Sequence, residues 1–298
     1  MDFLYRLDSL ALRIMSIIRL SFPDNEESFI CRRSSILRFV NRFSRRNDYL
    51  ENCSDSQIEC KKSRIIWIFW AQGFNAMPNL VKSCYQSVIR NSNGFTVCLV
   101  DMSNVGEYVS LPDYIFEKLN KGYITYTHFS DILRFALLSK WGGLYLDATI
   151  FVSSPIPHFD SLFTIKEKDN PQYASRGKWT GFLWYLPSNS SFAKYVISFL
   201  LVYWEKYNSL IDYFLVDYVI RSYYERNETF RNTIDSLEYS NPDLYFLQYQ
   251  LCDEPYNKEQ WEVLSKATRF FKTSWKQKRV RAKEEPSFYE VVLDLENS

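Results

Sequence analysis

Three charged side chains in the middle of the sequence have the types and spacing of a ligand site. Asp131 and Arg134 are three residues apart, and Asp147 ends an apolar run that follows two glycines. At this spacing two side chains point the same way on a helix. An isolated pair of this kind is usually a surface salt bridge, but here a glycine break leads directly into the strand that ends in Asp147. The pattern predicts a site for a charged small molecule at the carboxyl end of a strand.

Further oxygen atoms follow along the same strand. Tyr145, Asp147 and Thr149 share one strand face, because side chains alternate along a β-strand. A carboxylate and a hydroxyl at a strand end can hold ribose hydroxyls and a divalent cation beside a diphosphate. Mg²⁺ and Mn²⁺ prefer oxygen ligands and keep phosphate oxygens and waters in their shells. The strand end is therefore suited to a phosphorylated ligand.

Strands and helices alternate from residue 61 onward, which predicts an α/β fold. The continuous apolar run 65–70 is typical of a buried, parallel strand, and further strands are expected at 95–100 and 144–147. Such alternation indicates a Rossmann-like, mostly parallel sheet with helices on both faces. Helices are expected at about 78–89, 112–119, 127–140, 190–226 and 261–266, with a late strand at 269–271.

Residues 1–60 differ from the rest and are interpreted as a basic, amphipathic helical segment. Apolar residues recur at helical spacing over 4–18, and a second pattern over 30–46 has no acidic residue. A basic amphipathic helix can lie on an anionic membrane surface, or it can be a solvated helix that packs on the core or on a partner subunit. Periodicity does not separate these interpretations. The second pattern carries Arg32, Arg33, Arg38, Arg42, Arg45 and Arg46, with an apolar side of Ile36, Leu37, Val40 and Phe43.

The composition narrows the class of protein. The net charge of +1 gives no overall field to attract nucleic acid, and 18% of residues are aromatic, as in many cores and some sugar-binding sites. Six cysteines without CxxC spacing and two histidines disfavour a zinc site and indicate free thiols in a reducing cytoplasm. Charges interrupt every apolar run near the start, and no stretch reaches the roughly 20 residues of a membrane span. A cytoplasmic location is expected.

The central motif also resembles a known family. The run from Thr127 to Thr149, with HFSDILR followed by WGGLYLDAT, resembles glycosyltransferases of the capsular polysaccharide synthesis type, which carry a DXD-like motif and are similar to glycosyltransferase family 32. The resemblance covers about 61–276 and includes IIWIFWAQG, LPDYI, IDYFLVDY and the late KTSWK. It implies a GT-A fold over 61–285, with a helical N-terminal addition and a C-terminal addition that ends in a tail at 286–298.

The resemblance also implies roles for individual residues. Asp131 and Arg134 would grip hydroxyls of the donor sugar, and Asp147 would act with them as the third catalytic residue. Asp147 and Thr149 would bind Mn²⁺ or Mg²⁺, although Thr149 replaces the second carboxylate of a full DXD motif, so metal affinity should be lower. The donor-binding residues would further include Trp70, Asp101, Ser130, Tyr145, Lys272, Ser274 and Trp275. On the acceptor side the candidates are Asp212 and Asp217.

The activity implied is transfer of a sugar from a nucleotide-sugar donor to a glycan or lipid-linked acceptor in bacterial capsular or surface polysaccharide biosynthesis. Retention of the anomeric configuration is implied by the family, while the sequence itself identifies neither a nucleophile nor a general base. The N-terminal helices would allow peripheral contact with the inner face of the cell membrane. The alternative interpretations are a non-catalytic nucleotide-sugar-binding protein and a membrane-surface assembly protein.

Overall fold

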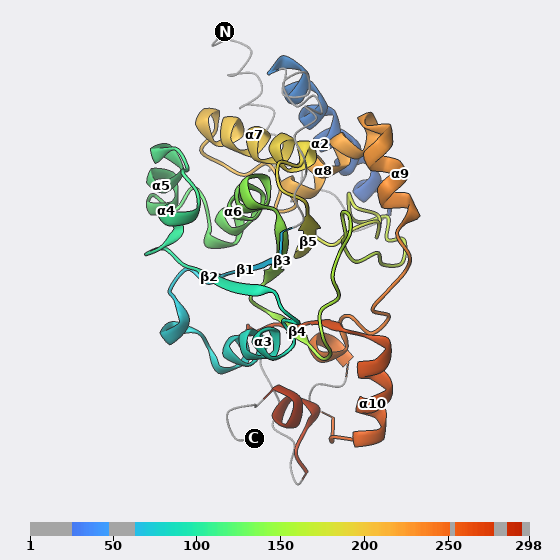
Figure 1. Cartoon of the computed structure of the whole chain (residues 1–298). Coiled ribbons are helices and arrows are strands. Elements are labelled where there is room, and N and C mark those ends of the chain that lie inside the picture. The colour runs from blue at the N-terminus through green and yellow to red at the C-terminus, as the bar shows by residue number, and fades with distance from the viewer. Residues whose placement is uncertain (1–25, 48–62, 251–253, 277–284, 294–298) are drawn as a thin grey trace.

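The computed structural model describes residues 26–47, 63–250, 254–276 and 285–293, which form a mixed α/β fold (Figure 1). At its centre is a four-stranded sheet with the order β2-β1-β3-β5. β1 pairs in parallel with β2 and β3, and β5 is antiparallel to β3 at one edge. The strands are β1 (Ile65–Phe69), β2 (Thr96–Val100), β3 (Gly143–Asp147) and β5 (Leu183–Leu186). The predicted mostly parallel sheet is confirmed.

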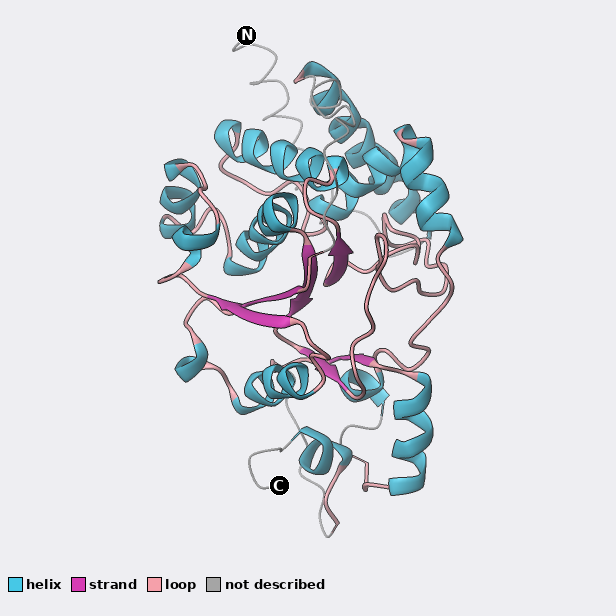
Figure 2. Ribbon diagram, viewed as in Figure 1, coloured by secondary structure: helices cyan, strands magenta, loops and turns pink. Residues whose placement is uncertain are grey.

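The central strands are buried on both faces, which is why their sequences are continuously apolar. Successive side chains point to opposite faces of a sheet. On β1, Trp67 and Phe69 belong to one hydrophobic core, whereas Ile66 and Ile68 belong to the other. Helices cover both faces, as the layers in Figure 2 show.

The first core lies between the sheet and a large helical layer. This layer contains α2 (Glu26–Arg46), α4 (Val105–Tyr108), α5 (Asp113–Asn120), α6 (Tyr126–Trp141), α7 (Ser191–Lys206), α8 (Leu215–Arg226) and α9 (Glu228–Ser236). The second core is covered by α3 (Asn79–Arg90), α10 (Lys258–Ala267), the β4–β6 ribbon (Ile150–Val152 and Phe270–Lys272) and the helical turns Phe246–Gln250 and Tyr289–Leu293. A short 3-10 turn, Phe74–Ala76, follows β1.

The double glycine after α6 is required by close backbone contacts. Gly142 has φ 67°, and a Cβ atom there would lie 2.4 Å from the backbone nitrogen of Ser188. Gly143 has φ 100°, and a Cβ atom there would lie 2.5 Å from the carbonyl oxygen of Ile65. At the other end of α6, the hydroxyl of Thr125 accepts from the backbone N–H of His128 at 3.2 Å and caps the helix. These two ends fix the path from α6 into β3.

The predicted basic helix is present as α2, and its apolar side is part of the first core. Ile36, Val40 and Phe43 are each at most 2% exposed. Arg32 forms an ion pair with Asp212, and Arg33 donates to the carbonyl of Pro171 at 2.6 Å. The packing therefore favours the interpretation of a helix docked on the core. The other predicted helix, 4–18, lies outside the described residues.

One predicted helix is divided in two. The segment 190–226 was expected to be helical because it has little Gly or Pro, but α7 ends at Lys206 and α8 begins at Leu215. The buried hydroxyl of Tyr203 donates to the carbonyl of Ser209 and accepts from the N–H of Ile211, so this loop is held by tertiary hydrogen bonds.

Two further findings concern β5 and the C-terminal end. β5 is an edge strand that the sequence pattern did not predict. In the predicted tail, Phe288 and Leu293 are buried in the second core. Among the helices of the described ranges, none is long and apolar enough to cross a membrane.

Candidate active site

The Asp131–Arg134 pair forms on α6, and it is buried instead of lying at the surface. Nη1 of Arg134 lies 3.0 Å from Oδ1 of Asp131, and the Arg134 side chain is only 3% exposed. Nδ1 of His128, on the same helix face, lies 3.5 Å from Oδ2 of Asp131. Removing two charges from water is costly unless further hydrogen bonds compensate. The pair must therefore be supported by its surroundings.

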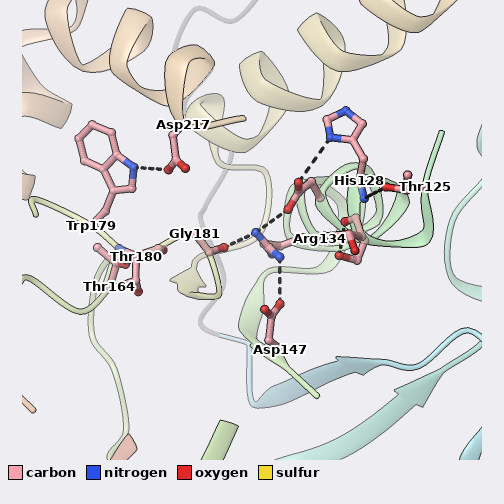
Figure 3. A network of polar contacts seen from close by, with 12 residues as sticks. Thr125, His128, Arg134, Asp147, Thr164, Trp179, Thr180, Gly181 and Asp217 are labelled. Carbon is pink, nitrogen blue, oxygen red and sulfur yellow. Dashed lines mark hydrogen bonds and ion pairs between the residues drawn. The ribbon is translucent and has the colours of Figure 1, made fainter. Parts of the chain in front are cut away.

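Arg134 receives that support by connecting three parts of the chain (Figure 3). Nη2 donates to Oδ1 of Asp147 at 3.0 Å, and Nη1 donates to the carbonyl of Gly181 in the loop before β5. The guanidinium lies over the buried ring of Tyr145, 4.7 Å from its centroid. Burial opposes the charge on Arg134, but Asp131 and Asp147 outweigh it and raise the pKa of the guanidinium. The cation is permanent and fixed in place.

Asp147 lies between two cations. Its Oδ1 accepts from Arg134, and its Oδ2 accepts from Nζ of Lys272 at 3.3 Å. The same ammonium donates to the hydroxyl of Thr149. Lys272 reaches this position because β6 pairs antiparallel with β4, which places it opposite Ile150. The pairing of β6 with β4 therefore places the side chain of Lys272 beside the end of β3.

These side chains line a cavity of about 680 Å³, a volume within the range of small-molecule sites. Ser130, Asp131 and Arg134 of α6 form one wall together with Asp147. The rest of the lining comes from the loop 166–182, residues 213–217 and the segment 239–245. The cavity lies at the carboxyl end of β3, on the side of the loop that leads into β5, since Asp147 and Phe182 both line it.

Asp217 of α8 is one of the acidic residues that line the cavity. Nε1 of Trp179 donates to its Oδ1 at 2.9 Å (Figure 3). Burial raises the pKa of Asp217 to about 7, against the lowering effect of the Trp179 bond, and the nearby charge of Asp131 adds to the rise. Part of the side chain faces the cavity. Near neutral pH this carboxyl can therefore both accept and donate a proton.

Three sequence-predicted residues lie together outside this cavity, at the ends of β1 and β2. The rings of Trp70 and Trp275 are 5.8 Å apart and perpendicular, and Trp275 is 45% exposed. The indole N–H of Trp70 is buried and has no acceptor within the described part of the chain. Asp101 accepts from the hydroxyl and the N–H of Ser103, bonds that lower its pKa. These residues form a second group on the same edge of the sheet as Asp147.

The remaining predicted residues do not line the cavity. Asp212 is 3% exposed, pairs with Arg32 and accepts from the N–H of Phe214 at 2.9 Å, so it ties α2 to the start of α8. Tyr145 is 1% exposed beneath Arg134. Ser274 is partly exposed and lies two residues after Lys272. Ser130, by contrast, lines the cavity and donates to the carbonyl of Thr127 at 2.6 Å.

Sequence reasoning missed most of the cavity lining outside α6 and β3. Apart from Tyr213, which lies in the predicted helix 190–226, these residues come from segments without helical or strand periodicity. Only the density of basic residues between 166 and 182 could have indicated some of them. The missed residues include Lys166, Lys168, Tyr173, Trp179, Tyr213 and Tyr239.

The side chains at the end of β3 do not fit a divalent metal. The described ranges contain no group of three or more His, Cys, Asp or Glu that could hold one. Both oxygens of Asp147 accept from cations, and the hydroxyl of Thr149 accepts from Lys272. Mg²⁺ requires an octahedron of oxygens and binds through carboxylates that are available to it. A metal ion held by Asp147 and Thr149 stays a prediction.

The fold and the site together define an α/β protein with a charged cavity at the carboxyl edge of a parallel sheet. The sequence matches the family described as capsular polysaccharide synthesis protein over residues 18–292, and the chain belongs to this family. This confirms the predicted capsular polysaccharide synthesis family, whereas the similarity to glycosyltransferase family 32 and the DXD-like motif stay predictions.

Comparisons with curated proteins and with solved structures do not extend this family assignment. No curated protein matches the sequence significantly. Among solved structures, the PaToxG glycosyltransferase is similar at a TM-score of 0.43 and 12% identity, with 68% of this chain and 80% of that chain covered. Similarity at this level does not define a function.

Proposed function

We propose that this protein is a glycosyltransferase of GT-A type that moves a sugar from a nucleotide-sugar donor to a glycan or lipid-linked acceptor. The observation that carries the proposal is the cluster of the buried Arg134 with Asp131 and Asp147, in a cavity at the carboxyl end of β3. Membership of the capsular polysaccharide synthesis family supports a place in capsule or surface polysaccharide biosynthesis.

The cluster suits a donor sugar because hydroxyl groups both donate and accept hydrogen bonds. The carboxylates of Asp131 and Asp147 accept from such hydroxyls, and Arg134 holds both carboxylates in position. Hydrogen bonds to ionised groups are roughly twice as strong as neutral ones, so a fixed cluster of this kind gives both affinity and orientation.

The group at the ends of β1 and β2 suits the nucleotide. Trp70 and Trp275 offer aromatic faces for a base, and Asp101 offers an acceptor for ribose hydroxyls or for the base edge. The first residue after β1 lies beside Asp147 on the sheet edge, since the last residue of β1, Phe69, pairs with it. A nucleotide here would direct its diphosphate toward Asp147 and Lys272.

The acceptor is assigned to the part of the cavity that Asp217 and Tyr213 line. Retention of the anomeric configuration, which the family resemblance implies, is part of the proposal. Proton NMR of the first-formed product measures it through the anomeric coupling. An inverted product would contradict retention and would assign Asp217 as the general base, because its pKa of about 7 is suited to that role.

Peripheral binding to an anionic membrane is a second, separate part of the proposal. Arg38, Arg42 and Arg45 are exposed on the outer side of α2, and each basic residue near an anionic surface contributes about 1 kcal/mol. The apolar side of α2 is not available for insertion, because it is in the core. Flotation with anionic vesicles should therefore show binding that salt abolishes. Salt-resistant binding, or none, would refute this electrostatic assignment.

The central test is donor turnover by the full chain. A thermal-shift screen across nucleotide sugars, with and without Mn²⁺, first identifies the donor, since ligand bound to the native state raises Tm. Release of nucleoside diphosphate then measures turnover. Asp147→Ala should lower turnover by roughly 10²-fold or more, as loss of a charge-stabilising group does.

The matched control is Asp113→Ala, which removes an exposed carboxylate at the start of α5. It should leave turnover unchanged. Near-wild-type turnover in Asp147→Ala would refute the assignment of this cluster as the active site. If a donor binds but no acceptor gives turnover, the protein is the non-catalytic nucleotide-sugar-binding protein considered above.

A further inference from the structure

We propose that the ammonium group of Lys272 takes the place of the divalent metal at the donor diphosphate, so that donor binding and sugar transfer by this chain need no metal ion. The inference rests on the proposed function and deepens it, because it concerns the charge that faces the leaving diphosphate.

The position of the ammonium is the first argument. Nζ of Lys272 lies 3.3 Å from Oδ2 of Asp147 and donates to the hydroxyl of Thr149. These are the two groups that the sequence predicts as metal ligands. The cation therefore lies where the sequence predicts a cation, and it is part of the chain itself.

The second argument is how firmly Lys272 is held. Its strand pairs with β4, and its own N–H donates to the carbonyl of Leu244 at 2.7 Å. The N–H of the next residue, Thr273, donates to the carbonyl of Thr149 at 2.9 Å. The ammonium also lies 5.1 Å from the ring centroid of Phe182, a favourable cation–π contact. Backbone pairing, and not a mobile loop, places this charge.

The third argument is the charge balance. Arg134 and Lys272 offset Asp131 and Asp147, so the cluster is neutral without a metal. A divalent ion at Asp147 and Thr149 would lie beside the ammonium, and like charges this close repel strongly. A lysine ammonium has three N–H donors. Within the described ranges Asp147 and Thr149 use two of them, and the third can donate to a phosphate oxygen in the cavity.

The chemical role follows from where charge develops. During transfer the bond from the anomeric carbon to the diphosphate oxygen breaks, and its electron pair leaves with that oxygen. The acceptor oxygen forms the new bond to the anomeric carbon, and its proton passes to the departing diphosphate. A fixed cation beside that oxygen stabilises the growing negative charge without reorganisation. Lys272 keeps its proton throughout and acts by charge and hydrogen bonding.

The test measures nucleotide binding, independently of turnover. The probes are UDP, GDP, CDP and ADP, titrated calorimetrically into the full chain in EDTA and in Mn²⁺. At least one should bind wild type with affinities within about twofold in the two conditions. Lys272→Met should lower the affinity in EDTA roughly 10- to 100-fold, the range expected for loss of one charged hydrogen bond. Lys121→Met, which removes an exposed lysine just after the C-terminal end of α5, should have no effect.

Two further variants separate charge from folding. Lys272→Arg keeps the cation and should bind the same nucleotide in EDTA. Lys272→Asp creates a second carboxylate beside Asp147, so its nucleotide binding should require Mn²⁺, and paramagnetic resonance should detect bound Mn²⁺ in this variant but not in wild type. Circular dichroism checks that both remain folded.

The outcomes also separate this inference from the proposed function. If wild type binds nucleotide only with Mn²⁺, or binds Mn²⁺ in a manner that Asp147→Asn abolishes, the inference is refuted while the glycosyltransferase proposal stands. If no nucleoside diphosphate binds in either condition, the proposed function fails and the inference fails with it. If Lys272→Met binds as wild type does, the lysine has no role at the diphosphate.

Discussion

Asp217→Asn should make the protein more stable, by an amount that grows with pH. In the folded protein the pKa of Asp217 is about 7, whereas its ordinary value is 3.8. The native state therefore holds a proton that the unfolded chain has already lost, and ionising Asp217 weakens the fold as the pH rises through this range. Asparagine avoids the penalty because it stays neutral, and its oxygen still accepts from Trp179.

The size of the effect follows from the shift. About three pH units at about 1.4 kcal/mol each give an upper limit of about 4 kcal/mol, reached above about pH 7. Urea denaturation of wild type and Asp217→Asn, from about pH 5 to about pH 8, measures the difference in the free energy of unfolding. This difference should rise by about 1.4 kcal/mol per pH unit up to about pH 7 and then level off.

Two comparisons make the test specific to Asp217. Trp179→Phe removes the N–H that favours the carboxylate, so the pH at which stability is lost should move upward. Asp101→Asn should behave differently, because hydrogen bonds from Ser103 lower the pKa of Asp101. That carboxylate stabilises the fold at every pH in the range, so its loss should lower stability by a constant amount. If the difference in unfolding free energy between wild type and Asp217→Asn did not change with pH, the pKa of Asp217 would have its ordinary value and the reasoning would be refuted.

Three more predictions concern the packing of Phe43, the backbone at Gly142 and the guanidinium of Arg134. Phe43→Ala should lower the free energy of unfolding by about 3–5 kcal/mol in urea titrations, because the ring is 2% exposed and links α2 to the core. Gly142→Ala should lower Tm markedly, since it adds roughly 1–3 kcal/mol of backbone strain to a contact 2.4 Å from Ser188. Arg134→Lys should lower donor turnover about 10- to 100-fold, because a lysine cannot bridge two carboxylates and a carbonyl at once.

The first two of these variants have matched controls. Val263→Ala, at a side chain 69% exposed on α10, should change the unfolding free energy by less than about 0.5 kcal/mol. Gly106→Ala adds a methyl group with no atom within 4 Å, so Tm should not fall. A Phe43→Ala variant as stable as wild type would contradict the docking of α2. Full donor turnover by Arg134→Lys would mean that the contacts of Arg134 with both carboxylates and with the Gly181 carbonyl are not needed for activity.

The parts of this fold that could be predicted from sequence are those set by local patterns. Apolar runs gave the central strands, and helical spacing gave the pairing of Asp131 with Arg134. The double glycine marked the turn into β3 because no other residue fits its two close contacts.

What could not be predicted depends on contacts between distant segments. The late strand was predicted and is present as β6, but its pairing with the three-residue strand β4, which brings Lys272 to Asp147, was not. The break between α7 and α8 depends on hydrogen bonds from the buried Tyr203, and the burial of Asp212 depends on Arg32 of α2. A residue such as Asp212 can be identified as acidic from sequence, but whether it faces a ligand or an arginine is decided by packing.

The pairing of β6 with β4 also bears on the order in which the site is completed during synthesis. Lys272 is separated from Asp147 by 125 residues, and chains emerge from the ribosome N-terminal end first. The helix and strand that carry Asp131, Arg134 and Asp147 are made well before the lysine that balances their charge. Non-local strand pairing of this kind is slow to form. A nascent or truncated chain that stops before β6 would therefore have Asp131, Arg134 and Asp147 with a net charge of −1, and only the nearly finished polypeptide would add the lysine that neutralises this cluster.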